Sequence, residues 1–270
     1  MNPILLAILA TASIGAICAI MLTVASKIMS VPTDETETDI RAILPGANCG
    51  ACGYAGCDGY ASALAGDGDV KTNLCIPGSD DVSLQISEIL GVEFEDVAER
   101  VAICHCGGSY DLSLPLHEYK GITSCAATKL LFSGDRTCNY ACLGYGDCAK
   151  ICPHGAICIQ DGVARINPDR CKGCGMCVRA CPNGIISTVA LSSQVIIKCS
   201  SCDRGAEVRK KCGAGCIACK RCEKVCPTGA LTVVNNLAVI DYDKCTGCSL
   251  CATVCTQKCI TAVDFSSSRK

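Results

Sequence analysis

The run Cys171-Lys-Gly-Cys174-Gly-Met-Cys177-Val-Arg-Ala-Cys181-Pro182 decides the fold of this chain, and a near copy follows as Cys245-Thr-Gly-Cys248-Ser-Leu-Cys251-Ala-Thr-Val-Cys255. A shorter run precedes each of them, Cys148-Ala-Lys-Ile-Cys152-Pro153 and Cys222-Glu-Lys-Val-Cys226-Pro227. Matching cysteines are 74 residues apart at four positions, 148/222, 152/226, 171/245 and 181/255. The sequence therefore predicts that one structural unit occurs twice.

The spacing Cys-x2-Cys-x2-Cys-x3-Cys is typical of ferredoxins with two cubane 4Fe-4S clusters, in which the fourth cysteine ligates the other cluster of the pair. Applied to both blocks, this rule predicts four ligand sets: Cys138, Cys142, Cys148 with Cys181; Cys171, Cys174, Cys177 with Cys152; Cys216, Cys219, Cys222 with Cys255; and Cys245, Cys248, Cys251 with Cys226. The first set departs from the pattern in its x3 and x5 steps, and Gly144 and Gly146 in the enlarged loop accommodate the difference.

Two hairpins are predicted between the cysteine runs. Residues 156–160 and 163–167 alternate around Asp161-Gly162, and residues 230–234 and 238–242 repeat this around Asn235-Asn236. Asn and Gly pairs suit two-residue hairpin turns. These are the small sheets of a ferredoxin-like fold.

The composition indicates that packing alone does not hold the chain together. The 270 residues include 29 cysteines, no Trp and 4% aromatic residues. Dense cysteine indicates disulfides, zinc or iron-sulfur clusters. Disulfides fit poorly because most cysteines fall in tight Cys-x2-Cys and Cys-x3-Cys steps, and zinc is the more serious alternative.

Charge divides the chain into two parts. Residues 33–111 hold 15 acidic and 3 basic residues, whereas residues 112–270 hold 20 basic and 11 acidic residues. Without stacking aromatics the basic half does not indicate nucleic acid, and an acidic protein partner fits better. The predicted docking surface, for which a merely solvated face is the alternative, is basic: Arg209, Lys210, Lys211, Lys220, Arg221 and Lys224.

Residues 3–26 carry no charge. At about 1.5 Å per residue this stretch is long enough for a transmembrane helix across the ~30 Å core of a bilayer. A cleaved signal peptide, the alternative, would carry a positive n-region, which is missing. Lys27 favours a cytoplasmic C-terminal side, as does the need of thiolate ligands for a reducing compartment.

A separate four-cysteine module follows, with Cys49, Cys52, Cys57 and Cys75. Glycines between these cysteines let the backbone wrap a bulky inorganic core. A 4Fe-4S cluster is predicted here, and structural zinc remains an alternative. Residues 82–90 and 94–101 have apolar residues at helical spacing, which predicts two packing helices.

Two groups of cysteines are incomplete as ligand sets, Cys104, Cys106 and Cys125 before the first block and Cys199, Cys202 and Cys212 between the blocks. We predict that they meet in a bridging 4Fe-4S site of Cys106, Cys125, Cys199 and Cys212, with unligated thiols or zinc as alternatives. Cys104 and Cys202 are possible replacements for their neighbours. The prediction is thus six clusters on 24 cysteines, which leaves Cys18, Cys104, Cys158, Cys202 and Cys259. His105 and His117 are interpreted as surface residues.

The order of these features, an apolar N-terminal helix, the Cys49 to Cys75 module and ferredoxin cysteines, resembles the family of Rnf B proteins, which belong to the membrane-bound ion-translocating ferredoxin:NAD oxidoreductase. With two ferredoxin blocks, the chain is similar to the longer members of that family. The resemblance implies an electron-transfer subunit of a translocase-type oxidoreductase that accepts electrons from a soluble acidic ferredoxin and relays them to membrane subunits. It also implies that NAD and flavin bind elsewhere, which agrees with the lack of dinucleotide and P-loop motifs.

Three other functions stay open: a polyferredoxin-type carrier of another membrane complex, an enzyme with an open iron at the Cys49 to Cys75 site, and a zinc-stapled membrane scaffold. The predicted fold is α+β, with one transmembrane helix, a small four-cysteine module and two tandem ferredoxin-like domains. The single-pass chain is expected in the inner (cell) membrane, with its soluble domains in the cytoplasm. Its predicted divisions are residues 1–27 (transmembrane helix), 28–38 (linker), 39–100 (module), 101–135 (connection), 136–192 (first ferredoxin-like domain), 193–213 (connection) and 214–270 (second ferredoxin-like domain).

Overall fold

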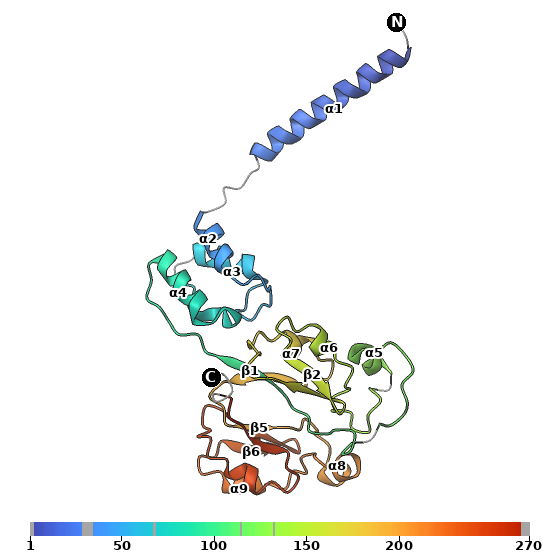
Figure 1. Cartoon of the computed structure of the whole chain (residues 1–270), viewed down its shortest axis with the longest axis vertical. Coiled ribbons are helices and arrows are strands. Elements are labelled where there is room, and N and C mark those ends of the chain that lie inside the picture. The colour runs from blue at the N-terminus through green and yellow to red at the C-terminus, as the bar shows by residue number, and fades with distance from the viewer. Residues whose placement is uncertain (1–2, 29–34, 67–68, 114, 132, 266–270) are drawn as a thin grey trace.

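The computed structural model describes residues 3–28, 35–66, 69–113, 115–131 and 133–265, in which short helices alternate with antiparallel strand pairs (Figure 1). The α-helices are α1 (Pro3–Ile28), α2 (Glu35–Ile43), α3 (Cys57–Gly66), α4 (Ser79–Leu90), α5 (Cys125–Leu130), α6 (Asp147–Lys150), α7 (Met176–Ala180), α8 (Gly205–Lys211), α9 (Arg221–Val225) and α10 (Leu250–Thr253). The strands are β1 (Arg100–Cys104), β2 (Ile157–Gln160), β3 (Val163–Ile166), β4 (Ile186–Ala190), β5 (Val195–Ile197), β6 (Leu231–Val234), β7 (Leu237–Ile240) and β8 (Ile260–Ala262). The mixed helix and strand content agrees with the predicted α+β class.

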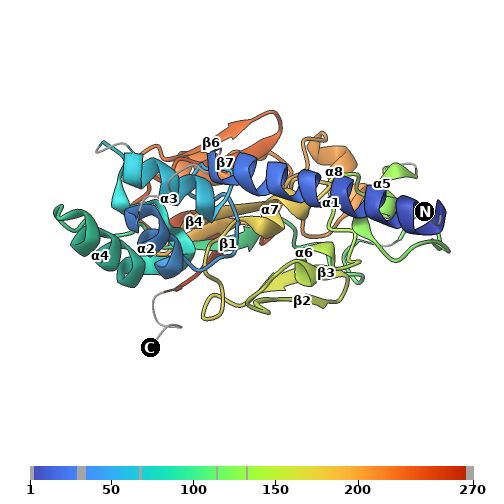
Figure 2. The same cartoon turned by 90° about the horizontal axis from the view of Figure 1, so that it is seen from above.

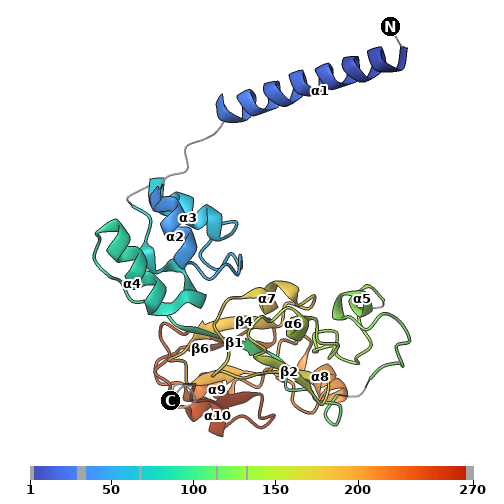
Figure 3. The same ribbon diagram turned by 45° about the horizontal axis from the view of Figure 1, so that its top comes forward.

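Helix α1 covers the predicted membrane-spanning stretch, residues 3–26, and stands apart from the other elements (Figure 3). Its described side chains are exposed and include Ile14, Ile17 and Leu22. Among the residues that the structure describes, no helix combines the length and apolar character needed to cross a membrane.

The four-cysteine module packs α2, α3 and α4 around the buried side chains of Ile40, Tyr60 and Ile86. Helix α2 begins at Glu35, inside the predicted linker 28–38, of which residues 29–34 lie outside the described residues. Helix α4 confirms the helix predicted at residues 82–90.

The helix predicted at residues 94–101 is wrong. Residues 100–104 form β1, which pairs antiparallel with β4, and the carbonyl of Glu99 accepts a hydrogen bond from Leu191 N at 3.0 Å. The partner strand lies almost 90 residues away in the sequence, so local periodicity could not reveal the pairing.

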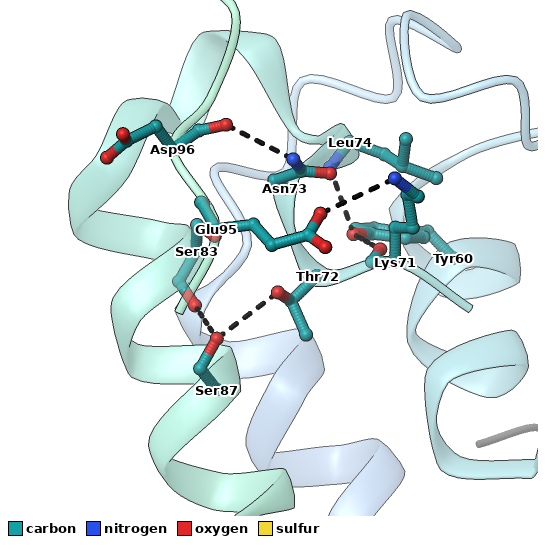
Figure 4. A network of polar contacts seen from close by, with 9 residues as sticks. All are labelled: Tyr60, Lys71, Thr72, Asn73, Leu74, Ser83, Ser87, Glu95 and Asp96. Carbon is teal, nitrogen blue, oxygen red and sulfur yellow. Dashed lines mark hydrogen bonds and ion pairs between the residues drawn. The ribbon is translucent and has the colours of Figure 1, made fainter. Parts of the chain in front are cut away.

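A network of polar contacts fixes the segment that leads to Cys75 (Figure 4). The Tyr60 hydroxyl donates to the carbonyl of Lys71 at 2.7 Å and lies 3.4 Å from Leu74 N, which donates to it. The Ser87 hydroxyl reaches Thr72 Oγ1 at 3.2 Å. Because α3 and α4 both bind this segment, the position of Cys75 relative to Cys57 on α3 is set.

The ferredoxin part of the chain consists of two units built alike. In the first unit β1 pairs with β4 and β2 with β3; in the second, β5 pairs with β8 and β6 with β7. The two hairpins lie on opposite sides of β1 and β4 (Figure 2). Strands β1 and β5 lie outside the predicted domains 136–192 and 214–270, so each unit takes its first strand from the sequence that precedes its cysteine block.

The backbone repeats with the 74-residue offset even where side chains differ. Both predicted hairpins are confirmed, and the central residues of their turns have positive φ: 50° and 75° at Asp161 and Gly162, 50° and 64° at Asn235 and Asn236. These values suit two-residue turns whose twist matches that of the strands. Left-handed residues recur in the same way at positions 146/220, 155/229, 173/247, 175/249 and 184/258. The duplication therefore extends to the loops that carry the cysteines.

Candidate iron-sulfur sites

A cavity between the two units is lined by four cysteines, Cys106, Cys138, Cys199 and Cys212. We call it the interunit cavity. Its cysteines form two equivalent pairs. Cys138 and Cys212 are 74 residues apart. Cys106 lies two residues after Cys104, which pairs with Ile186, and Cys199 lies two residues after Ile197, which pairs with Ile260. Cys104 and Ile197 occupy matching positions in the two units. Each unit thus contributes one residue of each pair.

The walls of the interunit cavity suit a negatively charged, bulky group. Cys142 N donates to Cys106 Sγ at 3.4 Å, and Cys216 N donates to Cys199 Sγ at 3.2 Å. Amide hydrogen bonds to sulfur stabilise the charge of a cluster. A Cβ atom on Gly108 would lie 3.2 Å from Cys212 Sγ, which leaves little room for any side chain there. Burial raises the pKa of Cys199 to about 11, so binding of iron must displace its proton.

Two of the predicted sets differ from the structure, because Cys125 and Cys138 exchange places between the bridging set and the first ferredoxin set. Cys125 lies in a different cavity, together with Cys142, Cys148 and Cys181, and Cys138 takes its place in the interunit cavity. Cys138 and Cys212 share the 74-residue offset, but so do Cys125 and Cys199, so the repeat spacing alone does not select the corrected pairing.

Asp147 explains why Cys125 joins Cys148. Its carboxylate accepts hydrogen bonds from the Ser124 hydroxyl at 2.8 Å and from Ala126 N at 3.0 Å, and Ser124 caps α5, whose first residue is Cys125. Asp147 is itself the first residue of α6, directly before Cys148. Burial opposes the charge of Asp147, yet these hydrogen bonds and Lys150 outweigh it and lower its pKa. One ionised carboxylate thus holds the starts of both helices together.

Two predicted sets line cavities of the second unit. One cavity is lined by Cys216, Cys219, Cys222 and Cys255. Another is lined by Cys226, Cys245, Cys248 and Cys251.

In each of the other two predicted sets, Cys152, Cys171, Cys174 and Cys177 in the first unit and the four cysteines of the module, the members influence the pKa of a cysteine of the same set. Burial raises the pKa of Cys177 to about 11, and the neighbouring thiols of Cys171, Cys174 and Cys152 add to the rise. In the four-cysteine module, burial raises the pKa of Cys75 to about 11, with further contributions from Cys49, Cys57 and Cys52. The structure therefore brings each of these sets together.

Two thiols outside the predicted sets lie beside them. Cys104 lines the cavity of Cys125 and Cys142, and a hydrogen bond between Cys104 and Cys142 raises the pKa of Cys104 and lowers that of Cys142 to about 6. Cys259 lines the cavity of Cys216, with its Sγ 3.5 Å from Cys255 Sγ. Cys104 is thus in the wrong cavity to replace Cys106.

The remaining thiols have other surroundings. Cys202 is exposed and contacts the carbonyl of Ser200, and Cys18 and Cys158 are exposed. All the cysteines that the structure describes are free thiols. Within the same described ranges, no three His, Cys, Asp or Glu side chains are arranged to hold a single metal ion.

His105 is not the surface residue that the sequence predicts. Its Nδ1 lies 2.7 Å from the carbonyl of Ile197, and its Nε2 lies 2.7 Å from Ser187 Oγ. Burial lowers its pKa, and the two contacts suit a neutral ring in which Nδ1 donates to the carbonyl and Nε2 accepts from the hydroxyl. It joins the two units beside the interunit cavity.

The predicted basic surface separates into two parts. On α8, Lys210 pairs with Glu207 at 3.2 Å, and Lys211, with 27% of its side chain exposed, pairs with Asp203 at 2.8 Å. Around α9, Lys220 and Arg221 line the cavity of Cys216. Arg221 and Lys224 also line an open cleft beside Cys255. Among the described residues, no acidic side chain forms an ion pair with these three cations.

Family models agree with the cysteine groups. A model described as a putative Fe-S cluster matches residues 44–77, a 4Fe-4S binding domain matches residues 164–187, and a 4Fe-4S dicluster domain matches residues 215–259. Repeated hairpin units around four-cysteine cavities define a polyferredoxin, a protein that carries several 4Fe-4S clusters.

Curated relatives match almost the full length. The chain is 39% identical, over 92% of its length and 94% of the relative, to the B component of the ion-translocating oxidoreductase complex of Methanosarcina acetivorans. It is 38% identical to the B components of two ferredoxin:NAD(+) oxidoreductase complexes. One is the Na(+)-translocating complex of Acetobacterium woodii, over 96% of this chain and 78% of the relative, and the other is the proton-translocating complex of Clostridium ljungdahlii, over 97% and 92%. The chain belongs to the Rnf B family.

Proposed function

We propose that the chain carries six 4Fe-4S clusters and conducts single electrons along them within an Rnf complex. The proposed ligand sets are Cys49, Cys52, Cys57 and Cys75; Cys152, Cys171, Cys174 and Cys177; Cys125, Cys142, Cys148 and Cys181; Cys106, Cys138, Cys199 and Cys212; Cys216, Cys219, Cys222 and Cys255; and Cys226, Cys245, Cys248 and Cys251. Each cluster supplies one-electron chemistry at a potential tuned by its surroundings. The protein's part is to hold the six in sequence.

The observation that carries the proposal is that residues of consecutive sets interact, through charge, through hydrogen bonds or within one core. At the module end, burial raises the pKa of Cys174, and Cys49 of the neighbouring set contributes to the rise. The Cys148 pKa of about 12, caused first by burial, includes a contribution from Cys177.

The contacts continue through the interunit cavity. Cys142 N donates to Cys106 Sγ on one side of it, and Cys216 N donates to Cys199 Sγ on the other. Cys222 of the next set and Cys251 of the last set lie in one hydrophobic core. These contacts support an order of the sets from the module to the second unit.

The names of two relatives include ferredoxin:NAD(+) oxidoreductase, which indicates ferredoxin as the electron donor and NAD(+) as the electron acceptor of the complex. We propose that reduced ferredoxin, a small acidic protein, delivers electrons at the second unit, where Cys219 is exposed and Lys220, Arg221 and Lys224 are unpaired among the described residues. The module then passes them to other subunits of the membrane complex. NAD and flavin belong to those subunits.

Anaerobically purified chain is expected to be brown, with a broad absorption band that reduced ferredoxin bleaches and about 24 iron atoms, four per cubane cluster. Iron and acid-labile sulfide analysis measures the count, and stopped-flow absorbance follows the bleaching. About 20 irons per chain would mean that the interunit cavity holds no cluster. A colourless zinc protein would contradict the whole proposal.

We also propose that α1 attaches the chain to membrane lipid through residues 3–26, with the clusters on the cytoplasmic side, where cysteines stay reduced. Its exposed apolar side chains favour lipid over water. A chain that begins at residue 29 is expected to leave the membrane fraction for the soluble fraction with its iron content unchanged. Retention of this shortened chain in membranes that lack the other subunits would contradict the proposal.

A further inference from the structure

We infer that the hydroxyl group of Ser113 donates a hydrogen bond to the iron-sulfur group of the interunit cavity and raises its reduction potential. The inference rests on the proposed function, because it needs a cluster bound by Cys106, Cys138, Cys199 and Cys212. It adds a residue that no cysteine pattern marks.

The side-chain hydroxyl group of Ser113 is buried and unpaired among the described residues. It lines the interunit cavity with only 1% of its surface exposed, and its Oγ has no hydrogen-bond partner among the described residues. A buried hydroxyl group normally finds an acceptor, because leaving it unpaired costs free energy. Cluster sulfides and cysteine thiolates are acceptors of the kind this cavity would contain.

The position of Ser113 beside the thiols follows from the contacts at Gly108. A Cβ atom built on Gly108 would lie 3.3 Å from Ser113 Cβ, 3.2 Å from Cys212 Sγ and 3.8 Å from Cys106 Sγ. The serine side chain and two of the four thiols therefore flank the same point of the cavity wall.

The backbone of Ser113 is already committed elsewhere. Its N–H donates to the carbonyl of Ser109 at 2.9 Å, and its carbonyl accepts from Arg136 Nη1 at 2.7 Å. Arg136 is 2% exposed, donates from Nη2 to the carbonyl of Gly162 at 2.9 Å and lies 4.2 Å from the centre of the Tyr110 ring. These contacts hold the serine in place, so its hydroxyl group needs no rearrangement to serve the cluster.

Two other serines line the same cavity, and both have partners. Ser200 Oγ donates to the carbonyl of His105 at 2.9 Å, and Ser201 Oγ accepts from Asp203 N at 3.3 Å. Since the proton of Ser200 is already used, that residue offers a matched control for Ser113.

The effect of the hydrogen bond follows from charge. Reduction adds one electron, and hence one negative charge, to the cluster without breaking a bond. A donor stabilises the more negative state more strongly, so it raises the potential. Ser113→Ala is therefore expected to lower the reduction potential by about 59 mV, which for one electron corresponds to about a tenfold change in the ratio of reduced to oxidised cluster.

The test is a redox titration of the full chain followed by electron paramagnetic resonance. The signal that Cys212→Ala removes identifies the cluster of the interunit cavity. In Ser113→Ala the midpoint potential of this signal is expected to fall with the iron content unchanged. In Ser113→Thr, which keeps the hydroxyl group, the midpoint potential returns toward the wild-type value. In Ser200→Ala it does not change.

An unchanged midpoint in Ser113→Ala, or an equal fall in Ser200→Ala, would overturn the inference, as would the loss of about four irons in Ser113→Ala. These results differ from failure of the proposed function. If Cys212→Ala removes neither signal nor iron from the chain, the interunit cluster itself is absent.

Discussion

Replacing Cys106 and Cys138 together by alanine is expected to remove about four irons per chain, whereas replacing Cys106 and Cys125 removes about eight. In the first pair both residues belong to one proposed ligand set, so the second substitution has nothing further to remove. In the second pair each residue belongs to a different set, because Cys125 lies with Cys142 and Cys148. Non-additivity of this kind identifies residues that act together.

The measurement is the iron content of chains purified anaerobically, in a background that carries Cys104→Ala. Cys104 lies in the same cavity as Cys125 and could ligate iron in its place. Cys158→Ala, which changes an exposed cysteine, is the control and is expected to keep all iron. The opposite pattern, eight irons lost with Cys138 and four with Cys125, would restore the grouping predicted from the sequence.

In the first double variant, ferredoxin should still reduce the second unit but not the module.

The ferredoxin units could be predicted because their determinants are local. Cysteines within a few residues of one another and two-residue turns such as Asp161-Gly162 fix their own geometry, and both hairpins are where the sequence predicts them. Gly146 and Lys220 are at equivalent positions and both have a left-handed backbone, so the loop conformation is kept although the residue type is not.

The interunit cavity could not be predicted fully because its cysteines come from four separate segments. A hydrogen bond from Ser124 to Asp147, across more than 20 residues, decides that Cys125 joins the first unit. Likewise β1 and β5 exist through pairing with β4 and β8, far away in the sequence. Ser113 had no signal at all, because a serine is marked only by the cavity that it lines.

The structure also changes the relative weight of the basic residues. Sequence counting treats α8 and α9 alike, but Lys210 and Lys211 are paired with acids of their own segment, and Lys211 lines the interunit cavity. Paired charges contribute little to a long-range field. The cations around α9 are the better candidates for steering an acidic protein to the cavity of Cys216 and Cys219.

Changing Lys220, Arg221 and Lys224 together to glutamate is therefore expected to slow association with ferredoxin by about tenfold to a thousandfold at low ionic strength, the range over which electrostatic steering acts. The same substitution should flatten the salt dependence of the rate, because screening has less attraction to remove. Stopped-flow bleaching at several salt concentrations measures both effects. Lys210→Glu is expected to change the rate much less, and Lys120→Glu, a change in an exposed residue of another segment that pairs with Glu118, controls for net charge. The net charge falls by six units in the triple variant and by two units in each single variant. Slowing in proportion to these changes would show that only the total charge of the chain matters, and an unchanged rate in the triple variant would place ferredoxin at another surface.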